Sequence, residues 1–161
     1  MIRPSRPDDV ATILDLAVLS GLFPGDATDE LAAVLKSCLS GENGPDHVWL
    51  TDDESGLVGV AYYAPERMTE GTWNLYMLAV HPDFQRRGRG AALVRYIERS
   101  LSSRGARLLL IETSGLASFE RTRAFYHTLG YLEEARIREF YKAGDDKVVF
   151  RKALTPPHNE S

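Results

Sequence analysis

Residues 80–100 of the chain read VHPDFQRRGRGAALVRYIERS. An apolar, strand-like run ends at Val80, and a run with the hydrophobic spacing of a helix follows the loop. Three arginines and two glycines occupy residues 86–90, between the two runs. A strand, a loop and the start of a helix bring several backbone N–H groups and the positive end of the helix dipole to one place. The stretch therefore predicts a site for an anion such as a phosphate group.

Both residue types in this cluster suit an anion, for different reasons. Gly88 and Gly90 let the backbone approach a ligand closely and adopt angles that a β-carbon would oppose. Arg86, Arg87 and Arg89 add positive charge and forked hydrogen-bond donors at the rim. These features predict a phosphate-binding loop and leave several classes of ligand open.

Other phosphate-binding classes fit the cluster less well. A P-loop requires Lys-Ser or Lys-Thr after its second glycine, and neither is present. A dinucleotide-binding fold would use Gly88 and Gly90 as its first glycines and Glu112 as the ribose-binding acid. Leu93 stands where its third glycine would be, however, and too few strand–helix units follow to complete that fold. Nucleic acid is disfavoured because no stripe of basic and aromatic residues extends the cluster.

The composition predicts a single globular domain. At 161 residues, with 43% hydrophobic and 26% charged residues, the chain is long enough to bury a core. Its formal net charge of −4 does not attract polyanions. Cys38 is the only cysteine, which excludes a disulfide within one chain and fits a reducing compartment. Residues 1–10 lack an apolar signal core and no run is long enough to span a membrane, so we expect a cytoplasmic protein without nucleic-acid or membrane partners.

Hydrophobic periodicity and turn residues predict strands and helices along nearly the whole chain. Strands are expected at residues 1–5, 47–51, 57–64, 72–80, 107–113, 131–141 and 147–153. Helices are expected at residues 8–23, 29–39 and 117–129, and from the arginine-glycine cluster to about Gly105. This order predicts a mixed α/β sheet with helices on its faces. The tail, residues 155–161, has nothing to bury and is expected to be disordered.

Two separated motifs resemble those of the GNAT superfamily of N-acetyltransferases. The stretch LAVHPDFQRRGRGAAL is similar to the family's acyl-CoA signature, Gln/Arg-x-x-Gly-x-Gly/Ala, placed after a strand and opening a helix. Gln85, Gly88 and Gly90 match that signature without a gap. Further on, IETSG and then ERTRAFYHTLGYLEEARI resemble the family's later strand and its helix ending in F-Y-x-x-x-G-F/Y. Two motifs in the right order and spacing make the resemblance specific.

The resemblance implies the fold and the reaction. The fold would be an α/β (α+β) acyl-CoA N-acyltransferase domain over residues 1–154, a mostly antiparallel sheet of about seven strands flanked by about four helices. The enzyme, a monomer or homodimer, would transfer the acetyl group of acetyl-CoA to a primary amine by direct attack in a ternary complex. No reactive cysteine lies near the motifs, which disfavours a covalent acyl-enzyme. The alternative is a non-catalytic acyl-CoA-binding sensor or partner module.

The sequence does not decide which amine accepts the acetyl group. The stretch ARIREFYKAGDDKVVF resembles the last strands of ribosomal-protein N-terminal acetyltransferases, which carry R-x-x-Y-Y followed by an acidic residue. This chain has Phe140-Tyr141 and Asp145-Asp146 instead. We therefore expect either a small amine or amino acid, which is slightly favoured, or a protein α-amine or lysine.

The same resemblance assigns the ligand contacts. It implies that acetyl-CoA is the cosubstrate. His47, His127 and His158 show no metal-ligand spacing with one another or with Cys38, so no metal is expected. Backbone amides of the loop would cradle the pyrophosphate, with contributions from Gln85, Arg86, Arg87, Gly88, Arg89, Gly90 and Ala91. The pantetheine arm would pair with the end of the preceding strand, at Leu78, Ala79 and Val80, in the manner of an added strand. Thr122 and Arg123 would face the CoA arm.

Two residues are candidates for proton transfer. The resemblance places Tyr126 as the general acid for the thiolate of CoA, whose pKa is about 8.5. Phe125, its neighbour, is expected to anchor the helix on the sheet. Glu112, at the end of an apolar strand, is the candidate base, because partial burial would make its carboxylate a stronger base. An ordinary surface glutamate is the competing interpretation, and Glu120 is a weaker alternative for the base.

Overall fold

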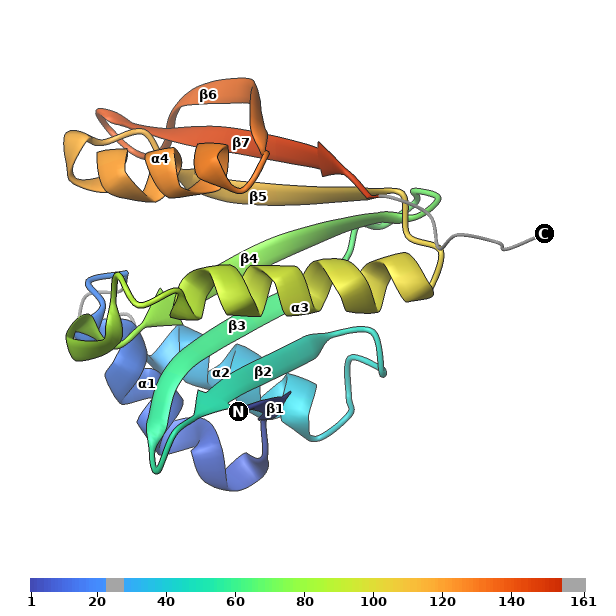
Figure 1. The fold of residues 1–161 in the computed structure, drawn as a ribbon, viewed down its shortest axis with the longest axis vertical. Coiled ribbons are helices and arrows are strands. Elements are labelled where there is room, and N and C mark those ends of the chain that lie inside the picture. Colours follow the sequence, from blue (N-terminus) through green and yellow to red (C-terminus); the bar gives the residue numbers. More distant parts are fainter. Residues whose placement is uncertain (23–27, 155–161) are drawn as a thin grey trace. The chain divides into compact units, whose positions relative to one another are not determined.

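The computed structural model describes residues 1–22 and 28–154. The strands are β1 (Ile2–Pro4), β2 (Val48–Asp53), β3 (Leu57–Pro65), β4 (Thr72–Val80), β5 (Leu108–Ser114), β6 (Leu132–Lys142) and β7 (Asp145–Ala153). The α-helices are α1 (Val10–Leu19), α2 (Thr28–Leu39), α3 (Arg89–Ser103) and α4 (Glu120–Thr128). The strands are ordered β1-β2-β3-β4-β5-β7-β6, with β4 and β5 parallel and the other pairs described here antiparallel (Figure 1). The predicted fold class, a mixed and mostly antiparallel sheet with four helices, is confirmed.

The chain forms two compact units. The first unit comprises Met1–Ala64 and Tyr76–Ile97, and the second comprises Pro65–Leu75 and the chain from Glu98 onwards. Strand β4 and helix α3 each contribute residues to both units. The expected disorder of residues 155–161 lies outside the described part of the chain, and the expectation of a single domain over residues 1–154 stays a prediction.

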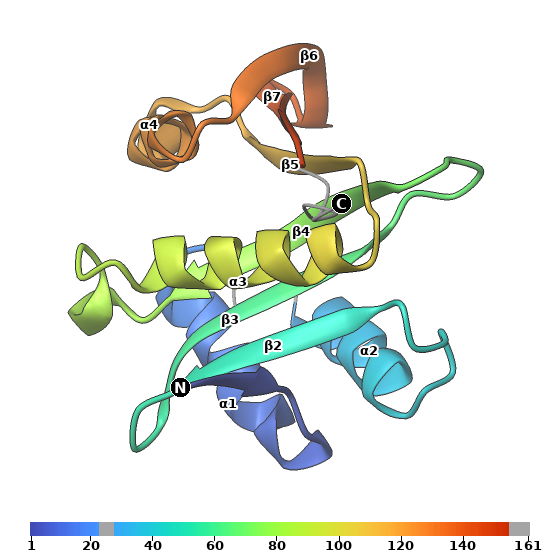
Figure 2. The ribbon, with the colours of Figure 1, turned by 45° about the vertical axis from the view of Figure 1, so that its right-hand side comes forward.

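Both faces of the strands in the first unit carry helices. Because successive side chains of a strand point to opposite faces, Val60 and Gly59 of β3 meet different partners. Val60 belongs to a core formed by α1, α2 and the strands, which includes Ile13 and Leu35. On the other face, a β-carbon built at Gly59 would lie 3.1 Å from the Leu93 side chain of α3, so glycine permits close packing there. Figure 2 shows α3 in front of β3, with α1 and α2 behind.

The first predicted helix is shorter than the sequence pattern suggests. A 3₁₀ turn at Pro7–Asp9 precedes α1 because the Asp9 carboxylate accepts hydrogen bonds from the Arg3 guanidinium (2.8 and 3.0 Å) and from the Arg6 N–H (2.7 Å). The Arg3 guanidinium holds the pKa of Asp9 below its ordinary value. After α1, Gly21 takes a φ of 78°, a left-handed conformation that commonly follows a helix end.

The sheet of the second unit is formed mainly by β5, β7 and β6. The first residues of β4, Thr72–Leu75, pair in parallel with Leu108–Ile111 of β5. Strand β7 lies antiparallel to β5, with Glu112 opposite Val149. Helix α4 packs on this sheet through aromatic rings; the His127 and Phe150 centroids are 5.2 Å apart.

Strand β6 is exposed along its whole length and carries a bulge. Its register with β7 shifts between Ile137 and Lys142, and Glu139 within the bulge has a φ of 53°. The Glu139 N–H donates to the Asp146 carboxylate (3.0 Å), and this bond, with one from the Arg136 guanidinium, lowers the pKa of Asp146. The bulge contains the Phe140-Tyr141 pair that the sequence singled out.

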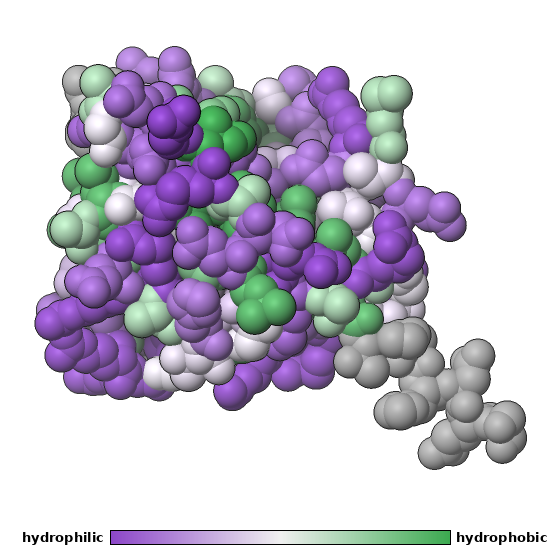
Figure 3. All heavy atoms as spheres, turned by 90° about the horizontal axis from the view of Figure 1, so that it is seen from above, coloured by the Kyte–Doolittle hydropathy of each residue, from purple (hydrophilic) through white to green (hydrophobic). Residues whose placement is uncertain are grey.

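The face seen in Figure 3 is mostly hydrophilic, with apolar side chains in small patches. No helix within residues 1–22 and 28–154 is long and apolar enough to cross a membrane.

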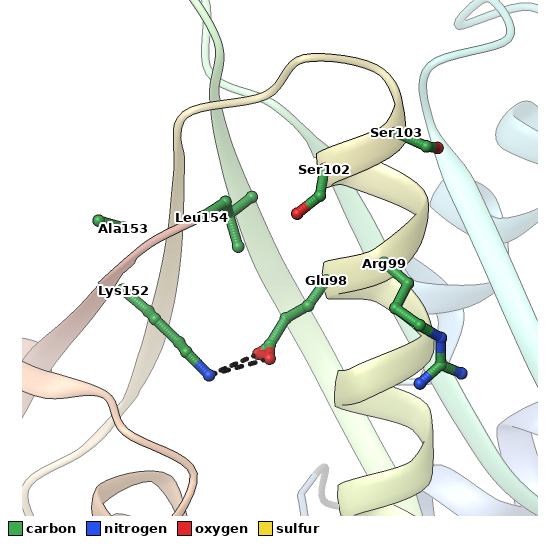
Figure 4. A pocket seen from close by; sticks show the side chains of 7 residues that line it. All are labelled: Glu98, Arg99, Ser102, Ser103, Lys152, Ala153 and Leu154. Atoms are coloured by element: carbon green, nitrogen blue, oxygen red, sulfur yellow. Dashed lines mark hydrogen bonds and ion pairs between the residues drawn. The ribbon is translucent and has the colours of Figure 1, made fainter. Parts of the chain in front are cut away.

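The end of α3 is joined to β7 by a charged network in the second unit. The Lys152 ammonium donates to both Glu98 carboxylate oxygens (3.0 and 3.1 Å) and to the Leu129 carbonyl (2.8 Å). The Tyr131 hydroxyl also donates to Glu98 (3.1 Å), and burial together with the negative charge of Glu98 raises the pKa of Tyr131. Figure 4 shows Lys152 and Glu98 pointing toward each other at a shallow pocket of about 330 Å³. This pocket contains none of the predicted site residues.

Replacing Lys152 by methionine tests this network. The variant keeps the aliphatic stem of the side chain. It leaves the mostly buried Glu98 carboxylate without its cation and the Leu129 carbonyl without its donor. We therefore expect the free energy of unfolding to fall by about 1–3 kcal/mol. Urea denaturation measures this loss of stability in Lys152→Met, and Lys36→Met, at an exposed lysine, is the matched control. Equal stability of the two variants would contradict the assigned role.

Candidate functional site

The loop between β4 and α3, in the first unit, has the backbone geometry of an anion site. A 3₁₀ turn at Pro82–Phe84 follows the strand, and the Gln85 amide donates back to the Val80 carbonyl (3.0 Å). Arg86 and Gly88 have φ values of 63° and 77°, both in the left-handed region. A concave run of backbone N–H groups forms when left-handed residues alternate with right-handed ones, and such concavities bind anions.

The start of α3 supplies N–H groups to the same loop. Ala92 N–H donates to the Gly88 carbonyl (3.0 Å), which opens the hydrogen-bond ladder of the helix. The N–H groups of Arg89, Gly90 and Ala91 precede that bond and have no acceptor within the helix. A phosphate placed at this helix start would accept these donors and meet the positive end of the helix dipole.

The arginine side chains of the loop have distinct partners. The Arg89 guanidinium donates to the carboxylates of Asp52 (3.2 Å) and Glu54 (3.0 Å), so this side chain is engaged within the protein, while its backbone N–H remains part of the loop. Asp52 is only 3% exposed, and Arg89 holds the pKa of Glu54 below its ordinary value. The Arg87 guanidinium lies 5.5 Å from the centroid of the Phe84 ring, a cation–π contact at the rim.

The end of β4 places the predicted pantetheine contacts. Ala79 is buried in the core shared with α1 and α2, whereas Leu78 and Val80 are half-buried. Tyr76 is exposed, and its ring lies 5.5 Å from that of Tyr62. The strand end therefore has a packed face and an accessible one.

Glu112, in the second unit, lies two residues before the end of β5 and is 23% exposed. Its carboxylate accepts a hydrogen bond from the Asn74 amide (2.9 Å) and an ion pair from the Lys147 ammonium (2.9 Å). Both contacts hold Oε1 of the carboxylate in place. Sequence reasoning missed Asn74 and Lys147; the available signal was one asparagine inside the apolar run TWNLYMLAV.

Tyr126 is the buried member of the aromatic pair on α4. It is 5% exposed, and its ring lies 5.8 Å from Phe150 and 6.2 Å from Tyr131. Burial raises the pKa of its phenol. Phe125, next to it, is half-buried. Tyr126 is the more buried of the two because, of two adjacent helix residues, only one can point straight at the sheet. The role of Tyr126 as general acid stays a prediction.

The other predicted residues near α4 fall into different settings. Arg123 donates from one guanidinium nitrogen to the carbonyls of Ser114 and Leu116, both at 2.8 Å, so it stabilises the loop after β5. Thr122 is half-buried, and its contact with CoA stays a prediction. Glu120 is exposed in the first turn of the helix, which leaves Glu112 as the better-placed base candidate.

No group of three potential metal ligands occurs among residues 1–22 and 28–154.

Comparison with known proteins identifies the family. The profile of the acetyltransferase (GNAT) domain matches residues 44–133. The chain belongs to the GNAT family. A solved structure from Desulfovibrio desulfuricans, assigned to the same family, shares 30% identity and a TM-score of 0.87 over 96% of this chain and 99% of its own. The predicted family resemblance is confirmed.

Two further proteins that are similar to this chain are named for different acceptors. The chain is 36% identical over 73 residues to the [ribosomal protein bS18]-alanine N-acetyltransferase of Escherichia coli K12, which is 45% of this chain and 48% of the relative. The chain thus spans about half the length of the curated relatives that it matches. An aminoglycoside 6'-N-acetyltransferase complexed with coenzyme A has the same fold, with a TM-score of 0.78 over 99% of each chain at 20% identity.

Gly88→Ala tests the conformation of the GNAT loop. Gly88 has a left-handed φ and open space where a β-carbon would lie, so alanine would introduce backbone strain without a clash. We expect the free energy of unfolding to fall by about 1–2 kcal/mol. Gly90→Ala is the matched control because Gly90 lies within α3, where alanine favours the helix. Equal stabilities in urea denaturation would show that the loop does not require the left-handed residue.

Proposed function

We propose that this GNAT protein is an N-acetyltransferase that transfers the acetyl group of acetyl-CoA to a primary amine. The observation that carries the proposal is the loop between β4 and α3. Its left-handed Arg86 and Gly88, followed by helix N–H groups without intrahelical acceptors, fit a pyrophosphate. The same residues carry the family's acyl-CoA signature.

Acetyl-CoA is bound as a substrate by backbone and side chain together. The pyrophosphate accepts N–H donors from residues 86–91, with charge added by the side chains of Arg86 and Arg87. The Gln85 amide keeps the loop closed against Val80. The amides of the pantetheine arm pair with the backbone of residues 78–80, and Thr122 contacts the CoA arm.

The reaction is a direct transfer with balanced protons. The amine arrives largely protonated, because its pKa is about 8 for an α-amine and about 10.4 for an alkylamine. Glu112 takes that proton, directly or through water, and the free nitrogen attacks the thioester carbonyl. The C–N bond forms, which leaves a positively charged nitrogen with one proton too many for an amide. The C–S bond breaks, Tyr126 gives its proton to the departing thiolate, and the extra proton of the nitrogen passes to the Tyr126 phenolate, directly or through water. Glu112 releases its proton to solvent before the next turnover. Burial raises the pKa of Tyr126, so this phenol is protonated at neutral pH.

The acceptor class is a primary amine. The similarity to a ribosomal-protein alanine acetyltransferase supports a protein α-amine. The fold similarity to an aminoglycoside acetyltransferase keeps a small amine alongside it. The bulge with Phe140-Tyr141 replaces the R-x-x-Y-Y pattern of the protein-modifying relatives, so a small amine or amino acid is the favoured acceptor. A cytoplasmic location and a monomeric or dimeric state stay predictions.

Release of free thiol from acetyl-CoA tests the proposed activity. Small amines, amino acids and peptides with free α-amines or lysines are supplied as acceptors, and we expect release that depends on one of these classes. Calorimetry with CoA measures binding separately. Tight CoA binding without turnover for any acceptor would identify the non-catalytic sensor, and failure to bind CoA would refute the loop assignment.

Tyr126→Phe tests the general acid. The variant keeps the ring that packs on Phe150 and removes only the hydroxyl, so CoA affinity and stability should be retained. We expect kcat to fall on the order of 10²–10⁴-fold. Tyr63→Phe, at another buried tyrosine, is the matched control. Full activity of Tyr126→Phe would show that another group protonates the thiolate.

A further inference from the structure

Asn74 is a polar side chain buried in the middle of an apolar strand. It is fully buried on β4, in the second unit, within the run TWNLYMLAV. A buried amide lowers stability unless its donors and acceptors are paired. Its Oδ1 atom has no hydrogen-bond partner among the described residues. A strand that needed only packing would carry an apolar residue here, so the amide has a different use.

The amide nitrogen of Asn74 bridges two carboxylates. Nδ2 lies 2.8 Å from Oε1 of Glu66 and 2.9 Å from Oε1 of Glu112. An amide nitrogen carries two hydrogens, and each can be donated to one carboxylate. The flipped amide would turn its oxygen toward two negative charges, so the two acceptors fix the orientation of Asn74.

Lys147 approaches the same oxygen from β7. Its ammonium lies 2.9 Å from Oε1 of Glu112 and 4.3 Å from the centroid of the Phe140 ring, and the side chain is 14% exposed. Within the described residues, the hydrogen bonds and ion pairs of the Glu112 carboxylate all end on Oε1. Oε2 is therefore the oxygen left for a proton from the substrate.

The charged groups around Glu112 come from neighbouring elements. Glu66 follows β3, Lys147 lies on β7, and Tyr141 lies on β6. Burial and the charges of Glu112 and Asp145 raise the pKa of Tyr141 to about 12, so its phenol is neutral at physiological pH.

We propose that Asn74 and Lys147 are positioning residues for the base of the acetyltransfer reaction. They fix Oε1 of Glu112, so that Oε2 is the oxygen that accepts the proton of the acceptor amine. Glu66 fixes the Asn74 amide in turn. This assignment rests on the proposed function, in which Glu112 is the base.

The pH dependence of kcat and KM tests the assignment. Asn74→Leu removes the amide and keeps a side chain of similar volume. We expect kcat to fall about 10–100-fold because the Glu112 carboxylate loses its orientation. The KM for acetyl-CoA should change less than about twofold. In Lys147→Met the ionised carboxylate loses its cation, so the acidic limb of kcat/KM should move to higher pH. Lys147→Arg should restore the wild-type limb, and the exposed Lys142→Met is the matched control.

A second readout does not depend on activity. Proteins labelled with ¹³C at glutamate carboxyls are titrated by NMR, and the Glu112 signal is assigned by its loss in Glu112→Gln. The midpoint of this signal should rise in Lys147→Met and, when the variant is folded, in Asn74→Leu. A wild type that releases no thiol for any acceptor would refute the proposed function. The positioning role would be overturned if the midpoint of the Glu112 signal stayed the same in both variants. It would also be overturned if the wild type were active and both variants kept its kcat and its acidic limb of kcat/KM.

Discussion

The start of α3 has backbone N–H groups for which the helix itself offers no acceptors, and the first unit is built to present them. Left-handed Arg86 and Gly88 turn the chain so that these donors follow one another along the loop. The Gln85 amide fixes the loop to the end of β4, and the packing of Leu93 against Gly59 holds the helix on the sheet. An anion-binding loop of this kind needs a rigid support, because donors that move lose their combined effect on a ligand.

In the second unit, the candidate proton-transfer residues are held in place by strand pairing and by ring packing. Glu112 receives its donors from separate strands, the amide of Asn74 on β4 and the ammonium of Lys147 on β7. Sheet pairing brings these residues together although they are far apart in the sequence. Tyr126 is held instead by aromatic packing on α4. The proposed proton-transfer residues are thus fixed by strand register and by ring contacts, respectively.

Much of the fold could be predicted from local sequence. Strand β4 begins and ends where its apolar run does, and α2 differs from its predicted range by one residue, because hydrophobic period and turn glycines are local signals. The range of α1 was wrong at its start, because Asp9 binds Arg3 instead of entering the helix. The greater burial of Tyr126 than of Phe125 was also not predicted, since helix phase against the sheet depends on where α4 packs.

The sequence by itself determined the family and predicted the anion-binding loop, because glycine spacing, arginine charge and the order of strand and helix are local properties of the chain. It also supplied Glu112 and Tyr126 as candidates. Only the tertiary structure decided what each side chain meets: Arg89 pairs with Asp52, and Glu112 with Asn74 and Lys147. These partners are separated by 37, 38 and 35 positions in the chain, and only strand pairing and packing make such residues neighbours.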